Sequence, residues 1–90
     1  MGEDSQRLIA EECDCIKEML LEKNRRYGDS ALSPMRVFSR ASAEEQIRVR
    51  LDDKLSRIAR GAGELADDED TLFDLVGYVV LLRVATRLAR

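Results

Sequence analysis

Histidine is absent from this 90-residue sequence, which excludes Ser-His-Asp and Cys-His catalysis and any histidine metal site. Chemistry must therefore come from carboxylates, lysines and arginines. Cysteine occurs only at Cys13 and Cys15, a spacing that matches neither a redox CxxC motif nor a zinc site. We expect both to be buried, reduced thiols.

The sequence also has no long hydrophobic run and no excess of basic residues. The longest apolar run, residues 75–82, is less than half of the roughly 20 residues that a membrane span needs. The net charge is −3, whereas duplex nucleic acid is bound through a basic surface. No apolar signal segment precedes the first helix. We therefore expect a cytoplasmic protein that neither enters a membrane nor binds duplex nucleic acid.

Proline occurs once and aromatic residues make up 4% of the chain, while 44% is hydrophobic and 37% charged. This composition predicts a single all-α domain over residues 1–90. Apolar spacings of three and four predict a first helix over residues 4–27, ended by Gly28. The capping box that begins at Ser42 predicts a second helix from residue 43, ended near Gly61 and Gly63. Acids at residues 67–70 predict the start of a third helix that continues to the C-terminus.

The third predicted helix is apolar on nearly all sides from residue 72 to residue 84, which indicates burial on several faces. A 90-residue chain folded as three helices has little surface with which to cover it. We therefore expect a small bundle of three main helices that is completed by a homodimer or a higher homo-oligomer. Gly77 would let a neighbouring backbone approach this helix closely.

Paired acids suggest a metal site. Asp70 and Asp74 lie one helical turn apart, where like charges repel, and Glu18 and Glu22 repeat the spacing on the first helix. A cation or a basic side chain between the two rows would relieve this repulsion. Mg²⁺ is commonly held by one or two carboxylates with water and substrate phosphates. The alternative is that these acids are solvated and that Asp70 only helps the helix to start.

Basic and polar residues suggest a site for a phosphorylated ligand. Arg50, Lys54 and Arg57 on the second helix offer the charges that phosphates need. The end of the first helix adds four polar candidates: Lys23, Asn24, Tyr27 and Ser30. Tyr27 has a ring on which a base could stack. The alternative is that the charges form ordinary surface pairs and that Tyr27 packs on the core.

Three segments together resemble the nucleotide modification associated domain family of phages and bacteria, over residues 23–82. They are Lys23-Asn24-x-x-Tyr27-Gly28-Asp29-Ser30, Arg50-x-x-Asp53-Lys54-x-x-Arg57 and Glu69-Asp70-Thr71-Leu72-x-Asp74-Leu75-x-Gly77-Tyr78. More distantly, the acids on helices resemble the all-α NTP pyrophosphohydrolases of the MazG type. This resemblance implies a Mg²⁺-dependent hydrolase that acts on a (deoxy)nucleoside triphosphate, in the cytoplasm of the host if a phage encodes it.

The resemblance also implies roles for individual residues: Asp70 and Asp74 would hold Mg²⁺, and Lys54 and Arg57 would contact phosphates. From the spacing of the acids we add Glu18 as a further metal ligand and Glu22 as the carboxylate that orients the attacking water. Arg50, Lys54 and Arg57 would neutralise charge on the phosphates. Cys15 stands where the MazG pattern has its third acid, and Thr71 stands where it has a glutamate. Two alternatives therefore remain open: a non-catalytic protein that binds or sequesters a nucleotide, and a helical protein-interaction module.

Overall fold

The computed structural model describes residues 2–60 and 69–90, with the side chains of residues 69 and 70 left out. It contains three helices: α1 (Gly2–Tyr27), α2 (Ala43–Arg60) and α4 (Glu69–Leu88). The described part of the chain has no strand, so the all-α prediction is confirmed. The helix α1 begins two residues earlier than predicted. Gly61, Gly63 and Asp67, predicted to mark helix ends, lie outside the described residues.

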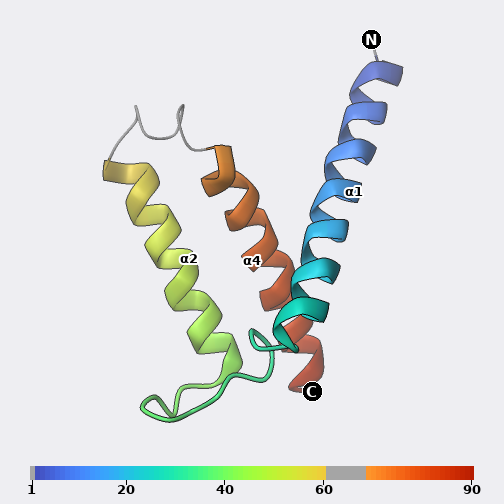
Figure 1. Cartoon of the computed structure of the whole chain (residues 1–90). Coiled ribbons are helices and arrows are strands. Elements are labelled where there is room, and N and C mark those ends of the chain that lie inside the picture. Colours follow the sequence, from blue (N-terminus) through green and yellow to red (C-terminus); the bar gives the residue numbers. More distant parts are fainter. Residues whose placement is uncertain (1, 61–68) are drawn as a thin grey trace.

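Helices α1 and α2 both pack against α4. Figure 1 shows α2 and α4 side by side and antiparallel, whereas α1 meets α4 with its C-terminal part and diverges from it toward the N-terminus. Contacts between helices occur for α2 with α4 and for α1 with α4. The position of α1 therefore depends on a short stretch of contact with α4.

The start of α2 follows the predicted cap. The backbone N–H of Glu45 donates to the Ser42 hydroxyl at 3.1 Å, which satisfies one of the free donors of the first turn. The Glu45 carboxylate, expected to complete the capping box, instead accepts from Arg48 at 2.9 Å. One turn later Ile47 is only 1% exposed. The cap thus begins α2 where its apolar side can pack on α4.

Two glycines have positions that their lack of a side chain explains. Gly28 ends α1 with a φ of 63°, in the left-handed region where a side chain is disfavoured, as predicted. A Cβ added to Gly77 would lie 3.0 Å from Met19 Cε and 3.4 Å from Leu20 Cδ2. Side chains of α1 therefore pack closely against Gly77, whereas the expected close approach of a neighbouring backbone stays a prediction.

Burial is where the sequence predictions fail. Cys13 and Cys15 are both exposed, free thiols, because α1 packs against the rest of the chain too little to bury any of its residues. On α4, Val76, Val79 and Val80 are exposed in the single chain, and their burial in a homo-oligomer stays a prediction. The single chain thus covers α4 only where α2 and the end of α1 reach it. None of the described helices has the length and hydropathy of a membrane span.

Replacement of Ser42 by alanine tests the cap. We expect Ser42→Ala to lower the free energy of unfolding by about 1 kcal/mol, because the N–H of Glu45 loses its acceptor. Ser56→Ala, on the exposed side of α2, should change it by less than about 0.5 kcal/mol. Urea denaturation followed by circular dichroism measures both. Equal effects of the two substitutions would contradict the cap.

Candidate functional site

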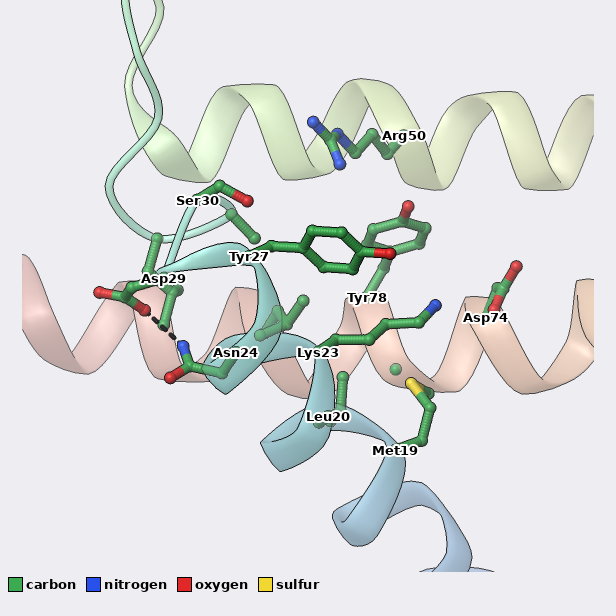
Figure 2. A pocket seen from close by; sticks show the side chains of 14 residues that line it. Met19, Leu20, Lys23, Asn24, Tyr27, Asp29, Ser30, Arg50, Asp74 and Tyr78 are labelled. Carbon is green, nitrogen blue, oxygen red and sulfur yellow. Dashed lines mark hydrogen bonds between the residues drawn. The ribbon is translucent and has the colours of Figure 1, made fainter.

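A pocket of about 260 Å³ lies where the end of α1 and the following corner face α2 and α4 (Figure 2). Helix α1 supplies Met19, Leu20, Lys23, Asn24 and Tyr27, the corner supplies residues 29–32, α2 supplies Arg50, and α4 supplies Asp74, Gly77, Tyr78 and Leu81. Its floor is apolar and its rim carries polar and charged groups. This volume is close to the lower end of the roughly 300–1,000 Å³ range of ligand pockets, so it suits one small ligand.

The corner after α1 holds one wall of the pocket in place. Both Gly28 and Asp29 have positive φ, 63° and 62°, and the N–H of Asp29 donates to the carbonyl of Asn24 at 3.2 Å. The Asn24 amide donates to the Asp29 carboxylate at 2.7 Å (Figure 2). The N–H of Ser33 then donates to the carbonyl of Asp29 at 2.9 Å. These bonds fix the loop that carries Ser30 beside the end of α1.

Two tyrosines and one arginine form the aromatic part of the pocket. Tyr27 is 59% exposed, so it does not pack on the core as an ordinary helix-end aromatic. Tyr78 is half-buried on α4, and the guanidinium carbon of Arg50 lies 5.9 Å from its ring centroid. That distance is within the range of a cation–π contact. Both rings line the pocket, where they offer faces on which a planar ligand can stack.

The carboxylate of Asp74 is paired with Lys54. Lys54 Nζ lies 3.2 Å from Asp74 Oδ2, with the two side chains 16% and 27% exposed. This ion pair joins α2 to α4 and neutralises the acid on the pocket wall. Asp74 is thus partnered by a basic side chain of α2, whereas its expected repulsion with Asp70 involves a side chain outside the described residues.

The charges that line the pocket are two cations, Lys23 and Arg50, and two carboxylates, Asp29 and Asp74. Asp74 is neutralised by Lys54 beside the pocket, and Asp29 accepts from Asn24 at the end of the pocket away from Asp74 (Figure 2). Lys23 and Arg50 have no carboxylate partner among the residues that the structure describes. These two cations are therefore available to an anionic ligand.

The structure brings together some of the predicted site residues. Those that line the pocket are Lys23, Asn24, Tyr27, Ser30, Arg50 and Asp74, and Lys54 is placed beside it by its bond to Asp74.

The other predicted residues lie elsewhere. Arg57, Glu18 and Glu22 are exposed and do not line the pocket. Glu22 accepts from Arg25 at 2.8 Å. The side chain of Asp70 lies outside the described residues. The polar corner and the basic face of α2 thus converge, whereas the acids of α1 do not join Asp74.

Two polar residues of the pocket, Asp29 and Tyr78, were not assigned a role from the sequence. Tyr78 follows Asp74 by four residues, so helical periodicity alone places it on the same face. Asp29 was visible as a polar residue after Gly28, but its positive φ and its bond to Asn24 arise from the conformation of the corner. Helical spacing could therefore have identified Tyr78 from the sequence. The place of Asp29 in the pocket depends on a backbone conformation that the sequence did not predict.

The described acids do not form a preassembled metal centre. In the part of the chain whose side chains are described, no three acidic or cysteine side chains converge on a point that could hold a metal ion. Asp74 is one carboxylate, already held by Lys54. Mg²⁺ can bind through one carboxylate together with water and phosphate oxygens, but at Asp74 it would compete with the lysine.

Comparison with known protein families, with curated proteins and with solved structures finds no significant match. The family resemblance drawn from the three segments therefore remains a prediction, and the site is interpreted from its own residues.

A double-mutant cycle tests the bond between Lys54 and Asp74. Because the pair is partly buried, we expect Lys54→Met and Asp74→Asn each to lower the free energy of unfolding by about 1–2 kcal/mol. The double variant should lose less than the sum, with a coupling of about 1 kcal/mol. Arg48→Met, in an exposed pair on the same helix, should cost less than about 0.5 kcal/mol. Strictly additive losses would contradict a direct interaction.

Proposed function

We propose that this chain binds a nucleoside phosphate in the pocket between α1, α2 and α4. The observation that carries the proposal is the convergence, from three helices, of two cations and two tyrosine rings on one small cavity. Neither cation has a carboxylate partner among the described residues. Phosphate oxygens would lie against Lys23 and Arg50, and the base would stack on Tyr27 or Tyr78. Base–aromatic stacking contributes about 1–3 kcal/mol per base. A cytoplasmic location, where such nucleotides are abundant, belongs to the same proposal.

The charges support binding that does not depend on a metal. The guanidinium of Arg50 can hold two phosphate oxygens at once, and the ammonium of Lys23 adds a point charge. Asp74 is neutralised by Lys54 and so adds little repulsion toward an anion. We therefore place the non-catalytic nucleotide binder ahead of the hydrolase.

Mg²⁺-dependent pyrophosphohydrolysis is the second candidate, favoured by the position of Asp74 on the pocket wall. With a metal bound there, Asp74 and the preceding Asp70 would supply carboxylate ligands, and the ion would polarise phosphoryl oxygens. Lys54, released from Asp74, would be free to approach a phosphate. Glu22 does not line the pocket, so its proposed role in orienting water has no support from its position.

Self-association is proposed as well, since the exposed apolar residues of α4 match the homo-oligomer expected from the sequence.

Thermal unfolding with a panel of nucleoside mono-, di- and triphosphates tests nucleotide binding. A ligand at about 100 times its Kd should stabilise the fold by about 2.7 kcal/mol, which shifts the midpoint by several degrees in a domain of this size. Lys23→Ala and Arg50→Ala should remove most of the shift. Arg83→Ala removes the same charge from an exposed site on α4 and should keep it. No shift with any nucleotide would remove the proposal and favour the interaction module.

Magnesium separates the two candidates. For the binder, the shift should be the same in EDTA and in Mg²⁺, and no pyrophosphate should be released from a triphosphate. For the hydrolase, pyrophosphate should appear only with Mg²⁺ and should fall at least about tenfold in Asp74→Asn, which corresponds to about 1.4 kcal/mol of barrier. A coupled assay for pyrophosphate measures both. Release that is unaffected by Asp74→Asn would exclude Asp74 as the metal ligand.

A further inference from the structure

The chain exposes more surface than a folded monomer of its size. Its accessible surface is 7177 Å², whereas a monomer of 10.2 kDa exposes about 5,300 Å², so the excess is about 1,900 Å². Its radius of gyration is 15.0 Å, against about 12 Å for a compact chain of this length. A standard protein interface buries about 800 Å² per partner. The excess is thus large enough for a stable interface.

Part of this surface is an apolar groove between α1 and α4, which adjoins the pocket described above and shares Leu20, Asn24, Leu32 and Leu81 with it. Its volume is about 500 Å³, and its lining is mainly aliphatic. From α1 it is lined by Cys13, Ile16, Lys17, Leu20, Leu21 and Asn24, and from α4 by Val76, Val80, Leu81 and Val84, with Leu32 from the corner. The groove follows the C-terminal part of α1, where that helix contacts α4.

Helix α1 also has an apolar stripe that can pack in this groove. Ile9, Cys13, Ile16 and Leu20 are spaced by four, three and four residues, which is the a/d spacing of a coiled-coil seam. The seam is symmetric about its midpoint between residues 14 and 15. An antiparallel copy of α1 would therefore place Ile9 opposite Leu20 and Cys13 opposite Ile16, apolar against apolar at every layer.

The charges of α1 favour the same antiparallel arrangement. Residues 2–14 carry five acids, Glu3, Asp4, Glu11, Glu12 and Asp14, against Arg7, and residues 15–27 carry four bases, Lys17, Lys23, Arg25 and Arg26, against Glu18 and Glu22. An antiparallel pair sets the acidic half of each helix against the basic half of the other, whereas a parallel pair sets acid against acid. Complementarity of one helix to itself specifies a second copy of this chain as the partner.

Space around the groove also favours an antiparallel pair. The C-terminal part of α1 already lies against α4, whereas the N-terminal part diverges from the rest of the chain (Figure 1). Ile9, on that free part, is 63% exposed. The N-terminal part of a second α1 can enter the groove, because it does not lie against the α4 of its own chain. The basic C-terminal part cannot enter, because it is already packed against its own α4. Each chain would then fill the groove of the other.

We infer that this protein forms a two-fold symmetric homodimer in which α1 of each chain packs, antiparallel to its counterpart, in the groove between α1 and α4 of the partner. The interface covers Cys13 and Ile16 at its centre and the valines of α4 at its sides. It also holds α1, which otherwise meets its own chain over a short stretch. The dimer does not rest on the nucleotide proposal, and either can fail without the other.

Sedimentation velocity of the full chain, in a concentration series from low micromolar upward, tests the dimer. The wild type should sediment as a dimer, and Ile9→Glu should sediment as a monomer. Val49→Glu provides the matched control, because Val49 is a similarly exposed residue on α2 (56%), and it should leave the dimer intact. A monomeric wild type at all concentrations, a higher oligomer, or an Ile9→Glu variant that remains dimeric would overturn the inference.

Disulfide crosslinking tests the antiparallel register in a background of Cys13→Ser and Cys15→Ser. In an antiparallel pair, the two copies of residue 9 lie about 17 Å apart along the helices, so Ile9→Cys alone should give no crosslinked dimer on oxidation. Ile9→Cys combined with Leu20→Cys should crosslink nearly completely, because these positions face each other. Efficient crosslinking through Ile9→Cys alone would show a parallel pair and overturn the arrangement.

Discussion

The close approach of α1 to α4 at Gly77 is the constraint on which the rest of the structure depends. Because Gly77 has no side chain, Met19 and Leu20 come within van der Waals reach of the α4 backbone. This contact brings the end of α1, with Lys23 and Tyr27, to the same part of α4 that carries Asp74 and Tyr78. A Cβ at position 77 would press on Met19, which lines the pocket, and on Leu20, which lines both the pocket and the apolar groove.

The two sides of this contact have different chemistry. On one side lies the pocket, in which Lys23 and Arg50 lack carboxylate partners in the described part of the chain and Asp74 is neutralised by Lys54. On the other side lies the apolar groove that continues toward Val76 and Val80. A charged cavity suits a small anion, whereas an aliphatic groove beside a free helix suits another helix. Binding of a ligand and association of chains thus use neighbouring surfaces of the same helix pair, which share Leu20, Asn24, Leu32 and Leu81.

Several local predictions agree with the structure because they depend on neighbouring residues alone. The cap at Ser42 and the left-handed Gly28 are set by hydrogen bonds and backbone sterics within a few residues. Burial was predicted less well. Cys13 was expected in a core, but burial depends on what another element covers, and α1 packs against the rest of the chain too little to bury any of its residues. The grouping of acids failed for a similar reason, since the exposed Glu18 and Glu22 do not line the pocket with Asp74.

The sequence by itself determined the helical class, the end of α1, the start of α2 and the polar character of the corner after α1, because these follow from composition, periodicity and capping. It also placed Lys54 and Asp74 on different helices, 20 residues apart. Only the tertiary structure decided that these two side chains form an ion pair and that Arg50, rather than Arg57, lines the pocket. Which residues of two helices meet depends on how far one helix slides along the other and at what angle they cross, and packing across the whole contact sets both.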